Sequence, residues 1–221
     1  MKILKSEYDV VLFDLDGTLS QSALGIKHSL EYALSQIGKT DIDLSDYSIY
    51  IGPPLLHTLT NYCKLNDDDA AKAFDFYVSH YNEKGKYENR LYNGIKELLI
   101  DLKSAGAKTV VCTSKYEGFA NEIAEILGIK ELFDAVCGAT LDGKRKEKAD
   151  IIPYALKTVN ADISCKAVMI GDTFFDAKGA ETAGVDFIGA LYGYGNKESM
   201  QKYNADKFAE SADDLRKYLF C

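Results

Sequence analysis

The chain has 221 residues, of which 47% are hydrophobic and 27% charged, as in a folded globular protein of one large domain or one domain with an insert. The formal net charge of −8 argues against nucleic acid or an anionic membrane as the main partner, because both favour a basic face. No apolar run approaches the roughly 18–20 residues that span a bilayer, and the charged start predicts no signal peptide. Five widely spaced cysteines predict reduced thiols in a cytoplasmic protein.

The first part of the chain predicts one strand followed by helices. Residues 9–13 are almost entirely apolar, which is typical of a strand buried on both faces of a sheet. From 20 to 87 there is no convincing strand, and helical patterns occupy 24–37, 55–63 and 70–81. Because this stretch is too long for a connection, we interpret it as a small helical domain with hinges near Ser20 and near 92–94.

Beyond residue 94, helical and strand patterns alternate. The helices are expected at 94–105, 118–127, 150–159 and 174–183, and the strands at 109–112, 133–137, 167–170 and 185–188. Such alternation indicates βαβ units, in which a parallel sheet is covered by helices on both faces. We therefore predict an α/β protein with a Rossmann-like parallel sheet core, residues 1–19 and 88–221, and an inserted all-helical domain, residues 20–87.

Polar residues follow several of the predicted strands. Ligands of open α/β sheets bind beyond the carboxyl ends of the strands, so these residues are the candidate site. They are Asp14-Leu15-Asp16-Gly17-Thr18, Thr113-Ser114-Lys115, Gly171-Asp172-Thr173-Phe174-Phe175-Asp176 and, before a helix, the basic run Lys144-Arg145-Lys146-Glu147-Lys148.

The residue types at this edge favour phosphate chemistry. Clustered carboxylates repel one another, and a divalent cation relieves that repulsion. Because the ligands on offer are oxygens and no histidine is near, Mg²⁺ is the expected ion. It would share its remaining positions with water and a substrate phosphate. Lys148 would add positive charge, and Thr113 a neutral hydrogen-bond donor, to the phosphoryl oxygens.

The same residues carry a family resemblance over essentially the whole chain. The Asp14-x-Asp16-Gly17-Thr18 motif, Thr113, a lysine before a helix and Gly171-Asp172-x-x-x-Asp176 occur in the order seen in haloacid dehalogenase superfamily phosphatases. The helical insert resembles that superfamily's helical cap. The turn Ile51-Gly52-Pro53-Pro54-Leu55 resembles the phosphoglycolate phosphatase-like subgroup, which also includes pyrophosphatases and nucleotidases.

The resemblance implies a role for each acidic residue. Asp14 would be the nucleophile that forms an aspartyl-phosphate, and Asp16 would protonate the leaving oxygen and then activate water. Mg²⁺ would be held by the Asp14 carboxylate, the backbone carbonyl of Asp16 and the Asp172 carboxylate. Asp176 would act through a metal-bound water or by orienting the lysine.

The resemblance also implies substrate contacts, some of which stay open. Thr113 matches the first residue of a Thr-Asn-Lys-like triplet, and Ser114 would offer its backbone N–H; Gly17 and Pro53 complete the set. Lys148 is preferred as the active-site lysine because Asp150 looks like an N-cap, which places Lys148 at the mouth of the helix. Lys146 and Lys144 are the alternatives, since the Lys-Pro pair common in the family is absent. The sequence also has Gln21 where the family usually has aspartate.

We therefore expect a Mg²⁺-dependent enzyme that hydrolyses small phosphomonoesters and resembles phosphoglycolate phosphatase. The expected partner is a small phosphorylated metabolite, and the expected state is a monomer or a homodimer. Alternatives are a pyrophosphatase, a 5′-nucleotidase or a phosphomutase like β-phosphoglucomutase. A different class also remains open, a non-catalytic protein that binds a phosphorylated ligand.

Overall fold

A six-stranded sheet forms the centre of the computed structural model, which describes residues 5–161 and 164–221. Neighbouring strands are parallel throughout, in the order β5-β4-β1-β6-β7-β8. The strands are β1 (Val10–Phe13), β4 (Lys108–Tyr116), β5 (Ala135–Ala139), β6 (Ala167–Gly171), β7 (Asp186–Ala190) and β8 (Lys207–Ala209).

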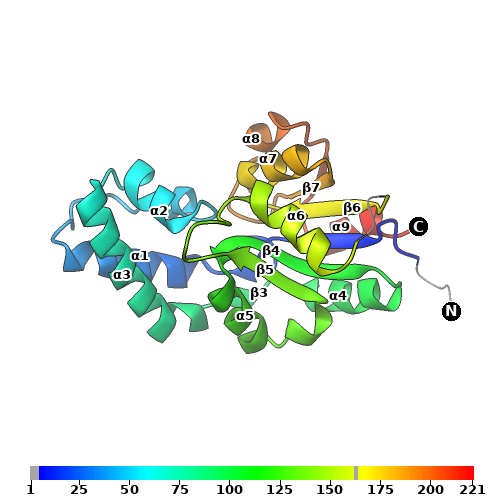
Figure 1. Ribbon diagram of the computed structural model, residues 1–221, viewed down its shortest axis with the longest axis horizontal. Helices are drawn as coiled ribbons and strands as arrows, with labels where there is room; N and C mark the ends of the chain where they lie inside the picture. Colours follow the sequence, from blue (N-terminus) through cyan, green and yellow to red (C-terminus); the bar gives the residue numbers. More distant parts are fainter. Residues whose placement is uncertain (1–4, 162–163) are drawn as a thin grey trace.

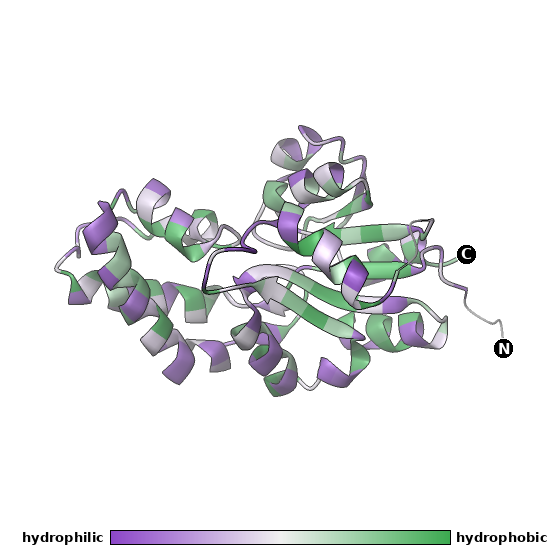
Figure 2. Cartoon of the chain, in the orientation of Figure 1, coloured by the Kyte–Doolittle hydropathy of each residue, from purple (hydrophilic) through white to green (hydrophobic). Residues whose placement is uncertain are grey.

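Helices cover both faces of the sheet (Figure 1). Along β1, side chains alternate between two apolar clusters: Val11 and Phe13 belong to one, Val10 and Leu12 to the other. The first cluster includes residues of α4 (Ile95–Ser104), α5 (Glu117–Ile126) and α9 (Ala212–Leu219). The second includes residues of α6 (Lys148–Thr158), α7 (Phe174–Ala183) and α8 (Lys197–Gln201). Figure 2 shows the strands mostly in hydrophobic or pale colours, as burial on both faces demands.

A group of helices lies beyond one end of the sheet (Figure 1). It contains α1 (Ala23–Gln36), α2 (Leu55–His57) and α3 (Asp67–Glu83), and α1 packs against α3. We call this group the cap. The chain leaves and rejoins the sheet domain through β2 (Ser20–Gln21) and β3 (Arg90–Leu91), which pair antiparallel. Within the described residues, no helix combines the length and apolar character needed to cross a bilayer.

The predicted fold class is confirmed, but several element bounds differ from the sequence prediction. The strand expected to end at Cys112 continues to Tyr116, because its pairing with β5 resumes after an irregularity. Ser20–Gln21 is a strand where none was expected, since two residues are too few to show a periodic pattern. The elements β8, α8 and α9, which follow the last predicted strand, were missed.

The packing of α4 generates a stability prediction. Leu99 is fully buried in the first cluster, whereas its neighbour Ile100 is 45% exposed. Leu99→Ala leaves a cavity and should lower the free energy of unfolding by about 2–5 kcal/mol. The matched change Ile100→Ala should stay within about 0.5 kcal/mol of wild type. Urea denaturation measures both, and equal losses would show that this face of α4 is not the buried one.

Candidate active site

The candidate site lies where the strand order reverses direction around β1. The chain adds β4 and β5 on one side of β1 and β6, β7 and β8 on the other. Phe13, the last residue of β1, is in register with Val111 of β4 and Ile170 of β6. Asp14 therefore emerges between two strands at a switch point, the place where such sheets bind ligands.

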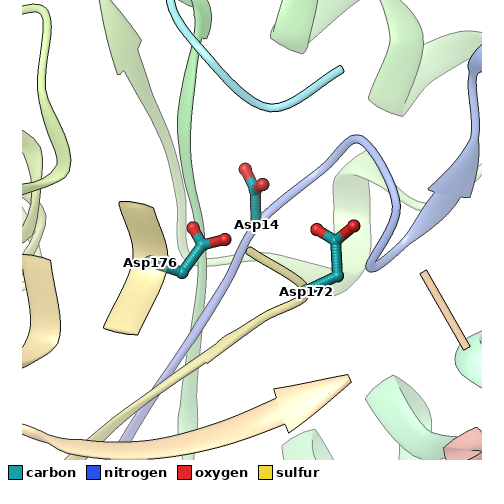
Figure 3. A group of neighbouring side chains, drawn as sticks. All are labelled: Asp14, Asp172 and Asp176. Carbon is teal, nitrogen blue, oxygen red and sulfur yellow. The ribbon is translucent and has the colours of Figure 1, made fainter. Parts of the chain in front are cut away.

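Three buried carboxylates meet at this point. Asp14 follows β1, Asp172 follows β6, and Asp176 lies in the first turn of α7. One oxygen from each lies within 4.8 Å of the others, and Figure 3 shows the three side chains close together. Asp172 is further fixed by the N–H of Tyr194, which donates to its Oδ2 over 2.7 Å. The sequence motifs thus come together as one acidic cluster.

Lys148 is the lysine that reaches this cluster. Its Nζ lies 2.8 Å from Oδ1 of Asp14, forms an ion pair with Asp176 and donates to the carbonyl of Cys112 over 3.0 Å. Of the alternatives, Lys146 is exposed beside the cavity described below, and Lys144 is exposed and pairs with Asp142.

The prediction that Asp150 is the N-cap of this helix was wrong. The N-cap of α6 is Glu147, and Asp150 is its partner in a reciprocal capping box. From the third position of the helix, Asp150 accepts a hydrogen bond at its Oδ2 from the N–H of Glu147 over 3.2 Å. Lys148 is therefore the first residue of the helix, and its side chain turns inward and is buried.

The electrostatics of the cluster favour an added cation. Burial raises the pKa of Asp14 to about 6 against the pull of Lys148, and burial together with Asp176 and Asp14 raises the pKa of Asp172 well above its usual range. Burial alone would lower the pKa of Lys148, but Asp14 and Asp176 raise it. Oδ1 of Asp14 is buried and accepts no hydrogen bond, although the Lys148 ammonium is near. A single ammonium faces three carboxylates, and the oxygen-only donor set suits Mg²⁺.

Asp16 is separate from the acidic cluster and has its own lysine. Its Oδ2 lies 2.8 Å from Nζ of Lys115, whose ammonium also sits 4.5 Å from the ring centre of Tyr81 in α3. The sequence predicts Lys115 at the candidate edge of the sheet but no role for it. Strand alternation does not predict its pairing with Asp16, because the register of β4 against β5 is irregular between Cys112 and Tyr116.

Close backbone approaches set the position of Asp172. Gly17 has a φ of +82°, and a Cβ on it would lie 2.1 Å from Oδ2 of Asp172. A Cβ on Gly195 would lie 2.0 Å from the Asp172 carbonyl oxygen. The loop that contains Tyr194 and Gly195 therefore packs directly against Asp172. Gly17 was expected to bind substrate, and the structure places it against Asp172.

A cavity of about 490 Å³ opens from the site toward the cap. Its core wall includes Asp14, Asp16, Thr113, Ser114 and Lys115, and its cap wall includes Pro53. The Thr113 hydroxyl accepts a hydrogen bond from the N–H of Lys115 over 3.3 Å, which leaves its own hydrogen available to a ligand. Among the predicted residues, Gly17, Lys148, Asp172 and Asp176 lie outside the wall.

Comparison with known proteins identifies the family. Residues 11–190 match the family model described as haloacid dehalogenase-like hydrolase. A predicted phosphatase from Clostridium acetobutylicum has the same fold, with a TM-score of 0.89 and 39% identity over 95% of this chain and 97% of that one. The chain therefore belongs to the haloacid dehalogenase-like hydrolase family, as its motifs predicted.

Relatives of similar identity carry different activities in their names. A 5′-nucleotidase of Pseudomonas aeruginosa is 35% identical over 96% of both chains. The tyrosine-protein kinase PtkA of Mycobacterium tuberculosis is 36% identical over 95% of this chain and 72% of its own. A phosphoglycolate phosphatase of Caulobacter vibrioides is 31% identical over 94% of this chain and 89% of its own. Similarity therefore defines the family more sharply than the substrate.

The repulsion within the acidic cluster generates a second prediction. Because the folded-state pKa of Asp172 is raised, ionisation of this group costs stability as the pH rises above the ordinary carboxyl range. In EDTA, Asp172→Asn should therefore raise the melting temperature, and by more at about pH 7.5 than at about pH 5. Mg²⁺ should raise the melting temperature of wild type by several degrees and that of the variant much less.

Thermal melts of wild type, Asp172→Asn and the exposed control Asp41→Asn test this account. The control should behave like wild type in EDTA and in Mg²⁺. A variant that is less stable than wild type in EDTA at neutral pH, or that keeps the full response to Mg²⁺, would contradict it.

Proposed function

We propose that the chain is a Mg²⁺-dependent phosphatase that hydrolyses small phosphomonoesters through an aspartyl-phosphate on Asp14. One observation carries the proposal: Asp14 lines the cavity, and its carboxylate lies beside Lys148 and two further carboxylates. A carboxylate held in this way presents an oxygen to a phosphorus atom in the cavity, while the buried charges stay fixed by the fold.

The proposed reaction has two steps on this chain's own residues. An oxygen of Asp14 bonds to phosphorus while the ester bond breaks, and Asp16 gives a proton to the leaving oxygen. Asp16 then takes a proton from a water that attacks phosphorus, which releases phosphate and restores Asp14. Both residues line the cavity, so both reach a phosphoryl group placed there. The Thr113 hydroxyl and the Ser114 N–H would hold its outer oxygens.

The carboxylates of Asp14 and Asp172 and the backbone carbonyl of Asp16 would hold Mg²⁺. When bound, the ion offsets the negative charge on the phosphoryl oxygens. Asp176 has a different task in this proposal, because one of its oxygens pairs with Lys148 and the other accepts from Thr173. It orients the lysine, which was one of the two roles considered for it.

The cap would exclude bulk water while Asp14 reacts. Its proposed bounds are residues 20–87, with hinges near Ser20 and 92–94. At these points β2 pairs with β3, so the two connections to the core lie side by side. A closed cap admits substrates that fit the cavity, so a small phosphorylated metabolite is the proposed partner.

The proposed location is the cytoplasm, and the proposed state is a monomer or a homodimer. Cys63, Cys112 and Cys137 are buried as free thiols, which supports a reducing compartment.

The phosphoglycolate phosphatase and the 5′-nucleotidase among the relatives support hydrolysis, whereas another relative is named as a tyrosine kinase. A phosphomutase or a non-catalytic binding protein would keep the same cluster. In neither of these alternatives does water accept the phosphoryl group, as it does in the proposed phosphatase.

Nucleophile replacement tests the proposal. Asp14→Asn should lower kcat for hydrolysis of p-nitrophenyl phosphate by at least about a thousandfold, because the covalent route is lost. EDTA should abolish wild-type activity, and added Mg²⁺ should restore it. Asp41→Asn, an exposed change of the same kind, should match wild type. Full activity of Asp14→Asn would refute the nucleophile, and an inert wild type would favour a mutase or a binding protein.

The acid role of Asp16 makes a separate prediction. The ratio kcat/KM reports the steps up to phosphorylation of Asp14, in which an alkyl leaving group needs a proton and p-nitrophenolate does not. Asp16→Asn should therefore lower kcat/KM for an alkyl phosphate by about 10²–10⁴ and for p-nitrophenyl phosphate by far less. Equal losses on the two substrates would assign Asp16 another role.

A further inference from the structure

The cap side of the cavity has a definite chemical character. On α3, Ala71, Phe74, Asp75 and Val78 recur at i, i+3, i+4 and i+7, so one face of the helix lines the cavity. Apart from Asp75, these side chains are apolar. Ile26 and Leu30, one turn apart on α1, extend the same apolar surface. This wall would face the organic part of a substrate whose phosphoryl group lies at Asp14.

Aromatic rings make this surface continuous from the cap to the core. Tyr77 and Tyr81 of α3 are stacked, with ring centres 5.6 Å apart and planes inclined by 7°. Tyr81 lies 5.4 Å from Phe119 of α5, which lies 5.5 Å from Tyr116 at the end of β4. All four residues line the cavity. Rings in this arrangement offer faces and edges on which another aromatic ring can pack.

The charges on the wall oppose an anionic organic part. Among the described residues, the cap contributes no lysine, arginine or histidine to the cavity, and its charged group there is the carboxylate of Asp75. On the core side, Lys115 already pairs with Asp16, and the exposed Lys146 also lines the cavity. On the cap side, a second carboxylate on the substrate, as in phosphoglycolate, would meet apolar surface and Asp75 rather than a cation.

On the cap side of the wall, one buried polar atom of the described residues lacks a hydrogen-bond partner. The Thr58 side chain is 2% exposed, and its Oγ1 forms no hydrogen bond. Buried hydroxyls are rarely left in this state, because the lost hydrogen bond to water is not replaced. Thr58 lines the cavity, so a bound ligand can supply the missing partner.

We propose that the cavity beneath the cap selects phosphomonoesters whose organic part is uncharged, aromatic and of nucleoside size, and that Thr58 forms a hydrogen bond with a polar group of that part. The inference rests on the proposed phosphatase function and specifies its substrate class. The volume of about 490 Å³ falls within the range of roughly 300–1,000 Å³ typical of small-molecule sites, and glycolate would leave most of it unfilled.

Two matched substrate pairs test the selection. Uridine 5′-monophosphate and ribose 5-phosphate differ by the base, whereas benzyl phosphate and phosphoglycolate differ by a ring in place of a carboxylate. With Mg²⁺, kcat/KM should be at least about tenfold higher for the aromatic member of each pair. Phosphoglycolate at or above benzyl phosphate would overturn the inference and leave the phosphatase function intact. Hydrolysis of none of the four would refute the function itself.

Variants of Thr58 test its hydrogen bond. Thr58→Val keeps the side-chain shape and removes the hydroxyl, and should lower kcat/KM for uridine 5′-monophosphate by about tenfold relative to benzyl phosphate. Thr58→Ser, which keeps the hydroxyl, should restore most of that ratio. Thr60→Val, whose hydroxyl bonds the carbonyl of Leu56 and lies off the wall, is the control. An unchanged ratio in folded Thr58→Val would overturn the role of Thr58.

A charge reversal tests the anionic wall. Asp75→Lys places a cation on the cap side and should raise kcat/KM for phosphoglycolate at least about fivefold relative to benzyl phosphate. Glu83→Lys makes the same change of charge on the same helix, away from the cavity, and should leave the ratio unchanged. If the two variants behave alike, the charge at Asp75 does not govern selection.

Discussion

The ammonium of Lys148, held between Asp14 and Asp176 in the interior, is the interaction on which the site depends. A buried charge is costly unless it is paired, so each of these groups requires the others. Two helices are fixed around the pair: α6 begins at Lys148 itself, and α7 begins with a capping box between Thr173 and Asp176. The helices meet closely, since a Cβ on Gly179 would lie 2.3 Å from that of Lys148. The lysine therefore links Asp14, the proposed nucleophile, to the packing of the domain.

The proposed tasks divide between the two parts of the chain. The core supplies the charged groups from strand ends and from the first turns of α6 and α7, and the cap supplies an apolar wall. They touch at points that bear on the chemistry. A Cβ on Gly52 of the cap would lie 2.8 Å from the Thr173 side chain, and Tyr81 of the cap contacts the ammonium that pairs with Asp16. A movement of the cap would therefore shift Tyr81 relative to Lys115 and change the surroundings of Asp16, the proposed acid.

Local pattern was enough to predict much of the fold and part of the site. Buried strands such as β1 show as apolar runs, and the residues after β1 and β6 reach the sheet edge wherever the strands pair in parallel. The local pattern gave wrong predictions where tertiary contacts determine the bounds of an element. Thr113 to Lys115 look like a polar loop but continue β4, and Asp150 looks like an N-cap although Glu147 takes that place. Contacts between residues far apart in the chain place Lys115 beside Asp16, Tyr194 beside Asp172 and Thr58 on the cavity wall. A short stretch of sequence does not contain both members of such a contact.

Trapping of the phosphoryl group tests the central claim most directly. Asp16→Asn, turning over p-nitrophenyl phosphate with Mg²⁺, should form the intermediate readily and hydrolyse it slowly, because activation of water is lost. Acid quench followed by peptide mass spectrometry should then find phosphate on Asp14. Phosphate on another residue, or no phosphorylated peptide while p-nitrophenol is released in a burst, would contradict the account.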